Sequence, residues 1–263
     1  MNALEHIGLT AGAIALTLPR IIAAFLMLPL LTGENMPPLV RNSFFVSLAI
    51  IVYPIAAATA ADNPLSHESA VIWPVLVIKE LFVGVLLGFL FGSVFWAVSA
   101  AGNLIDTKVG TNFAATLDPL QGHETSLTGQ LLAQLAGWLF LTTGGFTLFL
   151  GLLMKSYVLW PVAAMLPRAA PLGQSMVIDE FASLLTLALL LSAPALVVLS
   201  LLDLSLGLIN RYAQQLNVFS LTLPLKAWVA TWMVMLSLGT FVDVVTRHLF
   251  ANRDLLNHLR ALL

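Results

Sequence analysis

The residues best suited to acid–base or metal chemistry are few in this chain and lie far apart. The sequence has five histidines and no cysteine. Two histidines are each followed by a glutamate, in His67–Glu68 and His123–Glu124, but neither pair has a second histidine four positions after the first, as a zinc-binding helix requires. A nucleophile elbow, a phosphate-binding loop and a dinucleotide-binding glycine motif are also absent from the sequence. We therefore predict that the protein is not an enzyme and that it uses no cofactor and no metal.

Charged residues inside apolar segments are more informative, because a charge at the centre of a bilayer costs at least about 2.5–3.5 kcal/mol. On a helix, sequence neighbours face different ways, so we expect the side chains of Lys79 and Glu80 to point apart. Asp203 shares a helix face with Arg211 near a segment boundary, where snorkelling or salt bridging is favoured over a functional charged face. The charged residues in or at the ends of apolar segments are Arg20, Lys79, Glu80, Asp203 and Lys226.

The composition is that of a membrane-type protein. Of its 263 residues, 59% are hydrophobic and 9% are charged, and the mean hydropathy is +0.97. A soluble domain has about 25% charged residues, so this chain must hide its apolar surface in lipid or in a large apolar assembly. The net charge is −2 and there is no basic run, which argues against nucleic-acid binding.

Six apolar stretches approach the length of about 20 helical residues that crosses the hydrocarbon core of a bilayer. They are too long for barrel strands of about 9–11 residues and do not alternate, so helices are predicted throughout. The connections contain most of the prolines, and none resembles a flexible linker, so residues 1–263 are read as a single all-α domain. The stretches are Ile7–Leu31, Ser43–Ala61, Val71–Ile105, Leu127–Met154, Phe181–Leu202 and Val218–Val242.

The C-terminal tail has the pattern of an amphipathic helix, with leucines at helical spacing between Leu255 and Leu263. Two interpretations stay open, a solvated helix end and a docking helix for a cytoplasmic partner. Just before the tail, Asp243 and Arg247 are four residues apart, in the favourable order for a surface ion pair.

Gly84, Gly88 and Gly92 recur at every fourth residue of one apolar helix. Small residues at this spacing allow two helices to approach closely, and such packing drives helix association in membranes. The spacing predicts a packing face, either against another helix of this chain or against a neighbouring subunit.

The stretch Gln214–Lys226 contains Asn217, Phe219, Pro224 and Lys226, and it closely resembles the signature of the FliR/SctT family of flagellar and injectisome export-gate subunits. The resemblance continues in the family's order along nearly the whole chain, through Pro37–Pro38 and Arg41, Lys79–Glu80 with its glycine helix, and Val109–Pro119. Flagellar members tend to have glycine where this chain has Thr222, so the injectisome branch, with a role in virulence, is favoured. A flagellar gate subunit is the alternative.

The resemblance implies a single-copy subunit of the type III secretion export gate, built from bent helical hairpins. About residues 1–180 would be similar to the P subunit (SctR), and about residues 181–263, including the tail, to the Q subunit (SctS). Its partners would be the P, Q and U (SctU) subunits and unfolded secretion substrates. It would reside in the bacterial inner membrane and be raised towards the periplasm when assembled.

The resemblance also implies that the central loop of the family acts as a pore plug. Its candidate residues here are Gly110, Phe113, Ala114, Asp118 and Pro119. They lie within Asp106–Glu124, and a connection of this length in a helical domain is usually functional or disordered. The more distant alternative for the whole chain is a small-solute transporter, which should have paired intramembrane acids and repeated halves with broken helices; only the broken helices are found.

Overall fold

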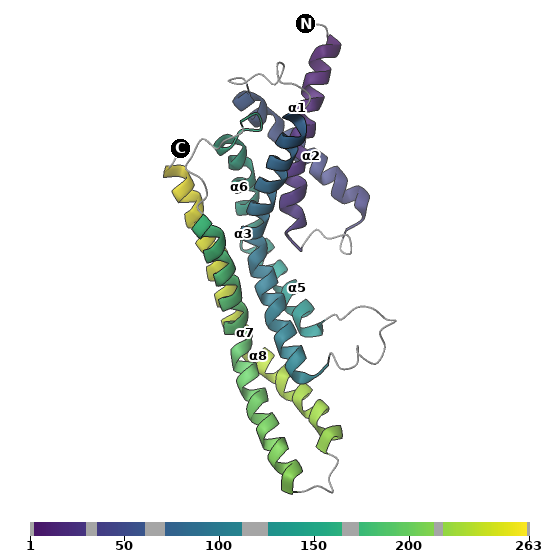
Figure 1. Cartoon of the computed structure of the whole chain (residues 1–263), viewed down its shortest axis with the longest axis vertical. Helices are drawn as coiled ribbons and strands as arrows, with labels where there is room; N and C mark the ends of the chain where they lie inside the picture. The colour runs from purple at the N-terminus through teal and green to yellow at the C-terminus, as the bar shows by residue number, and fades with distance from the viewer. Residues whose placement is uncertain are drawn as a thin grey trace. The chain divides into compact units, whose positions relative to one another are not determined.

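The computed structural model of the chain describes residues 3–29, 36–60, 72–111, 126–164, 174–212 and 218–261. These residues form helices and short connections, and none of them is in a strand (Figure 1). The all-α, membrane-type fold predicted from the composition is therefore confirmed. The helices are α1 (Ala3–Leu26), α2 (Pro38–Ala60), α3 (Ile72–Val109), α5 (Leu127–Thr142), α6 (Gly145–Leu159), α7 (Gln174–Tyr212) and α8 (Val218–Ala261).

Among the described residues, four helices are long and apolar enough to cross a membrane, namely α2, α3, α7 and α8. The first predicted stretch, Ile7–Leu31, is described only in part, and its described portion contributes the shorter apolar helical segment Ile14–Leu26 of α1. The fourth stretch differs, since α5 and α6 are bent by 70° at a short break and together form at most one broken span. Gly144 explains the break, because its φ of +83° is left-handed backbone that glycine adopts readily and that ends a helix.

The chain divides into two compact units of interleaved segments. The first unit comprises Met1–Gly92, Gly144–Val177 and Phe250–Leu263, and the second comprises Ser93–Thr143 and Ile178–Leu249. Helices α3, α7 and α8 each contribute residues to both units. The division into a P-like part and a Q-like part is a different partition and stays a prediction.

In the first unit, α2 packs against α1 and α6, and the contacts include a cluster of aromatic rings. The ring of Phe25 on α1 meets the ring of Phe149 on α6 edge to face, with the centroids 5.1 Å apart. Phe25 also lies against Phe44 and Phe45 of α2, each at 5.5 Å. Edge-to-face geometry suits the quadrupoles of the rings and adds to the gain from burying their area.

The glycine face of α3 lies directly against α1 of the same chain. A methyl group added at Gly84 would lie 2.8 Å from Cβ of Ala23, and one added at Gly88 would lie 2.6 Å from Cβ of Met27. At Gly92 the added group would lie 2.5 Å from the carbonyl oxygen of Met27. The absence of side chains at these positions lets the backbones of α1 and α3 touch.

In the second unit, buried residues of α3, α7 and α8 form the core, including Ile105, Leu199 and Ala230. The opposite faces of α7 and α8 are apolar and exposed. In their most apolar windows only 33% of α7 and 17% of α8 is buried. Trp228 of α8, for example, is 76% exposed. Apolar surface of this extent is typical of a protein that contacts lipid or other subunits.

The surface pair predicted near the C-terminus is confirmed. The Nε of Arg247 donates a hydrogen bond of 2.9 Å to Asp243, and both side chains are exposed. The C-terminal tail, predicted to be an amphipathic helix, is helical and forms the last part of α8, which continues to Ala261. The side chains beyond Leu249 lie outside those that the structure describes.

Candidate functional site

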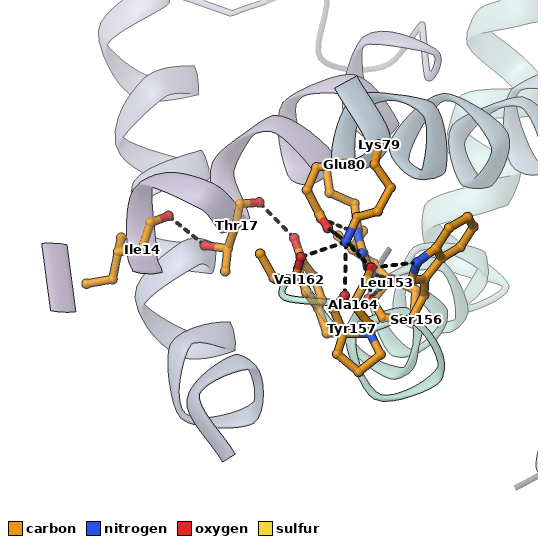
Figure 2. Close-up of polar contacts among 12 residues, drawn as sticks. Ile14, Thr17, Lys79, Glu80, Leu153, Ser156, Tyr157, Val162 and Ala164 are labelled. Atoms are coloured by element: carbon orange, nitrogen blue, oxygen red, sulfur yellow. Dashed lines mark hydrogen bonds and ion pairs between the residues drawn. The ribbon is translucent and has the colours of Figure 1, made fainter. Parts of the chain in front are cut away.

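A buried ionic cluster lies in the first unit, where α1, α3 and the end of α6 meet (Figure 2). At its centre, the guanidinium of Arg20 makes two parallel hydrogen bonds to the carboxylate of Glu80, of 2.6 and 2.9 Å. Both side chains are completely buried. A two-bond arginine–carboxylate pair is among the strongest polar contacts in proteins, and it also fixes the relative orientation of its two helices.

The remaining donors of the two cations are directed at the C-terminal end of α6. Arg20 donates to the hydroxyl of Ser156 at 3.0 Å and to the carbonyl oxygen of Trp160 at 2.9 Å. The Nζ of Lys79 donates to carbonyl oxygens of the segment that follows, at 2.9 Å for Pro161 and 2.7 Å for Val162. The carbonyl end of a helix carries partial negative charge, so two cations here are stabilised by the backbone as well as by Glu80.

The expectation that Lys79 and Glu80 point apart is wrong. Their charged groups form an ion pair, with Nζ of Lys79 2.8 Å from Oε1 of Glu80. The two residues are neighbours on the helix, but both side chains have several rotatable bonds, so their charged groups can meet in the same buried cluster. Figure 2 shows them meeting there.

The cluster carries one more positive than negative charge, and aromatic groups complete its lining. The guanidinium carbon of Arg20 lies 4.2 Å from the ring centroid of Tyr157, within the range of a cation–π contact. The Tyr157 hydroxyl donates to the carbonyl oxygen of Thr17 at 2.8 Å. In the part of the chain that the structure describes, no buried side-chain nitrogen or oxygen lacks a partner. The buried polar atoms of the cluster are therefore all hydrogen-bonded, and the cluster joins α1, α3 and the end of α6.

A second polar site lies in the second unit, at the base of the central segment, residues 112–125, which the structure does not describe. Helix α3 ends there at Gly110, whose φ is +94°. The carbonyl oxygen of Asp106 accepts the N–H groups of Gly110 at 3.0 Å and Thr111 at 3.2 Å, as in a glycine-terminated helix cap. The Thr111 hydroxyl donates to the same oxygen at 3.0 Å. Thr111, the last described residue before the central segment, is therefore bonded to Asp106 through both its N–H and its hydroxyl.

The side chain of Asp106 contacts the first residues described after the segment. Its carboxylate accepts the hydroxyl of Ser126 at 2.6 Å, the backbone N–H of Thr128 at 2.9 Å and the hydroxyl of Thr128 at 2.5 Å. Ser126 is the N-cap of α5, and its oxygen also accepts the N–H of Gly129 at 2.8 Å. Asp106 is only 5% exposed, and its carboxylate lies at the positive end of α5, which favours a negative charge.

A close backbone approach holds α5 against α3 beside this site. A methyl group added at Gly102 of α3 would overlap the backbone of Thr128 and Gly129, and one added at Gly129 would lie 2.9 Å from the carbonyl oxygen of Ser99. Two glycines that face each other let the first turn of α5 rest on α3 without intervening side chains.

A third charged group joins α3, α7 and α8 within the second unit. The carboxylate of Asp203 pairs with Lys108 at 3.1 Å and with Lys226 of the Gln214–Lys226 motif at a shorter distance. Salt bridging is one of the outcomes expected for Asp203 near its helix end, and the structure shows it, with Lys108 and Lys226 as partners. Near these residues, a methyl group added at Gly110 would lie 3.2 Å from Cδ2 of Leu223, so the start of α8 is close to the end of α3.

Lys226→Ala is expected to reduce secretion several-fold with little effect on the amount of protein. Asp203 is one-third exposed and keeps Lys108, so the free energy of unfolding should fall by only about 0–1 kcal/mol. The variant, however, loses the ion pair that joins the start of α8 to Asp203 of α7. Secretion and chain abundance should be measured together, with Arg211→Ala on the exposed face of α7 as the control. Wild-type secretion by Lys226→Ala would mean that this lysine is only a solvated helix end.

The predicted site residues are distributed as follows. Gly84, Gly88 and Gly92 lie in α3, Pro224 and Lys226 lie in α8, and Gly110 ends α3. Asn217, Phe113, Ala114, Asp118 and Pro119 lie outside the described residues, as does the side chain of Phe219. No group of three or more His, Asp or Glu residues that could hold a metal ion occurs in the described ranges.

Asp106 and its partners were not singled out from the sequence. An aspartate four residues before a helix-ending glycine gives no specific signal, and neither does the later Ser126-Leu-Thr128-Gly129. Only the fold brings the two together across the twenty positions between Asp106 and Ser126.

Taken together, the long apolar helices and the buried ionic cluster that joins them are typical of a membrane protein. Residues 11–251 match the profile of a family described as "Bacterial export proteins, family 1". The chain belongs to this family, which confirms the resemblance to the FliR/SctT proteins. It is a multi-pass protein of the bacterial inner membrane.

Curated relatives come from both injectisomes and flagella. The chain is 36% identical to Yop proteins translocation protein T of Yersinia pestis. The aligned region of 222 residues covers 84% of each chain. It is 33% identical to secretion system apparatus protein SsaT of Salmonella typhimurium, over 82% of each chain. It is 31% identical to flagellar biosynthetic protein FliR of Bacillus subtilis, over 91% of this chain and 90% of the relative.

Proposed function

We propose that this chain is a non-enzymatic pore subunit of a type III secretion export gate, which helps to form and close the channel for unfolded secreted proteins. The observation that carries the proposal is family membership, supported by the contacts of Asp106 with Thr111 and Ser126, the described residues on either side of the central segment. Energy for transport would come from elsewhere in the apparatus, because the described polar groups serve as joints between helices.

The exposed apolar faces of α7 and α8 support assembly with other subunits. Trp228, Trp232 and Met235 are each more than 60% exposed and follow one another at helical spacing. We propose that P (SctR) and Q (SctS) subunits cover these faces, and that the U (SctU) subunit joins the assembly. On this proposal, about residues 1–180 correspond to the P-like part and about residues 181–263 to the Q-like part, and the assembled gate is raised towards the periplasm.

We further propose that the central segment is the plug of the channel. Phe113, Ala114, Asp118 and Pro119 would form it, with Phe113 as its largest apolar group, and Gly110 at the end of α3 would lead into it. A small apolar segment can block ions by excluding water and can yield to a threaded polypeptide, so no chemistry is needed for gating.

The injectisome branch is favoured for this subunit. Thr222 has a small hydroxyl side chain where flagellar members tend to have glycine. The identity of 36% to the Yersinia translocation protein, against 31% and 28% to the FliR proteins of Bacillus subtilis and Escherichia coli, supports the same branch. Restoration of effector secretion in an injectisome that lacks its own T subunit would support this branch, and restoration of flagella alone would favour the alternative.

The plug is tested by ion leakage through the assembled gate. Phe113→Ala, and replacement of residues 113–124 by a glycine–serine segment of equal length, should each raise the ion conductance of purified gate complexes in proteoliposomes several-fold, without lowering the yield of complex. Phe82→Ala is the matched control, because Phe82 is a half-exposed aromatic of α3. Unchanged permeability in both central-segment variants would refute the plug.

A further inference from the structure

The charged cluster that joins α3, α7 and α8 carries one more positive than negative charge. It consists of Lys108, Asp203 and Lys226, all within the second unit. We propose that Lys108 and Lys226 bind the phosphate headgroup of an anionic phospholipid at the border of the bilayer. This goes beyond the proposed function, since it concerns the lipid around the second unit and does not depend on the plug.

The surplus charge of this cluster is accessible from outside the protein. The side chains of Lys108 and Asp203 are 36% and 33% exposed, and that of Lys226 is 14% exposed. The cluster around Arg20 also has a surplus cation, but it is buried, and Lys79 there donates to backbone carbonyl oxygens. An ammonium group has three donors, so a lysine can contact a carboxylate and a phosphate oxygen together.

The cluster lies at one border of an apolar band that has the thickness of a bilayer. No Asp, Glu, Lys or Arg occurs between Glu180 and Asp203 of α7. At a rise of 1.5 Å per residue these two carboxylates are about 35 Å apart along the helix, and Lys226 is about 33 Å from His248, which contacts Glu180. The hydrocarbon core of a bilayer is about 30 Å thick, so both helices bring the lysines to the depth of the headgroups.

Exposed leucines adjoin the lysines on the side of the apolar band. Leu104 lies one turn before Lys108 on the same face of α3 and is 38% exposed. On α7, Leu201 is 59% exposed and Leu204 is 67% exposed, on either side of Asp203 in the sequence. A phospholipid combines a phosphate with acyl chains, so it matches a basic pocket between membrane helices that is bordered by apolar side chains.

The surface proposed for other subunits lies on a different face of α8. Lys226 reaches Asp203 of α7, whereas Trp228, two positions later, is 76% exposed. Residues two positions apart on a helix do not face the same way. Subunits that cover the tryptophan face and a lipid at the lysines can therefore be bound to one gate together.

The first test uses purified gate complexes in vesicles of equal parts phosphatidylglycerol and phosphatidylcholine. A photoreactive amino acid is placed at position 204, beside the cluster, and mass spectrometry of the cross-linked chain compares its adducts with the two lipids. One surplus charge near an anionic headgroup should favour phosphatidylglycerol about five-fold. The same amino acid at position 189, in the uncharged stretch of α7 where Leu189 is 59% exposed, should show no preference.

Two results of this experiment would overturn the inference. One is equal reaction with both lipids at position 204. The other is reaction at position 204 with a neighbouring subunit in place of lipid, which would assign the lysines to a protein partner.

The second test changes the charge of the cluster. Lys108→Gln leaves one lysine for one carboxylate, so the preference for phosphatidylglycerol at position 204 should disappear, whereas Lys108→Arg should keep it. Lys155→Gln, which removes a cation from α6 in the first unit, is the control and should also keep the preference. An unchanged preference in Lys108→Gln, at normal yield of complex, would contradict the site.

The unaltered chain provides a test that does not depend on the folding of a variant. Salt screens exposed charges, so the five-fold preference should decline as sodium chloride is raised. At constant ionic strength, an excess of inorganic phosphate should leave the preference intact, because the acyl chains hold the lipid in place. A preference that salt does not alter, or that inorganic phosphate abolishes, would overturn the assignment to a lipid headgroup.

Discussion

Glu80→Ala is expected to prevent the chain from accumulating in an assembled gate. The substitution leaves Arg20 and Lys79 buried beside each other without their anionic partner. Removing one partner of a buried ion pair destabilises a protein by about 3–5 kcal/mol, which is a large share of a total stability of about 5–15 kcal/mol. The yield of purified complex and its unfolding temperature in detergent should both fall sharply.

A paired variant distinguishes charge imbalance from loss of packing. Arg20→Met combined with Glu80→Leu removes both charges and keeps apolar volume, and Lys79 retains its carbonyl acceptors after α6. Replacing a buried pair by apolar groups is often neutral, so the double variant should accumulate better than Glu80→Ala alone. A double variant that is worse than either single change would mean that the cluster acts through its geometry and not through charge balance.

Gly88→Leu is the second change with a large expected effect. A methyl group at this position would already lie 2.6 Å from Cβ of Met27 and closer still to the carbonyl oxygen of Ala24, so a leucine must push α1 away from α3. Overpacking a tight core by a few methylene groups costs about 1–3 kcal/mol, and here the obstacle is a backbone that cannot move aside. Gly88→Leu should therefore block formation of the complex, and Gly88→Ala should lower its unfolding temperature.

Gly151 provides the matched control for this prediction. It lies within α6, and an added methyl group there would have no neighbour within 4 Å. Gly151→Ala should be neutral or slightly stabilising, since alanine favours a helix by about 1 kcal/mol over glycine. A normal yield of complex with Gly88→Leu would show that this face of α3 is not closely packed in the assembled protein.

The helices were predictable because the apolar stretches are longer than strands or loops usually are. What the stretches did not reveal is where a helix breaks. Leu127–Met154 is uncharged and continuous in hydropathy, but Gly144 adopts left-handed backbone and the segment bends by 70°. Its neighbour Gly145 lies within a helix, so residue type alone does not separate the two glycines.

The polar contacts were less predictable, because they depend on which helices meet. Adjacency suggested that Lys79 and Glu80 point apart. Instead, the Glu80 carboxylate pairs with Arg20, which lies sixty positions earlier in the sequence, and Lys79 pairs with the same carboxylate. Spacing identified the glycine face of α3 but left its partner open, and in the structure that partner is α1. The resemblance predicted the family and identified the motif around Lys226. It did not predict that Asp203 pairs with both Lys226 and Lys108.

The central claim, that this chain lines a conduit for unfolded polypeptides, is tested most directly by cross-linking to a substrate halted in transit. A photoreactive amino acid at position 113 should join the chain to a secretion substrate whose folded C-terminal domain has stalled it in the gate. The same residue at position 82 on α3 should join it far less. Efficient stalling with no substrate cross-link from position 113 would contradict the account.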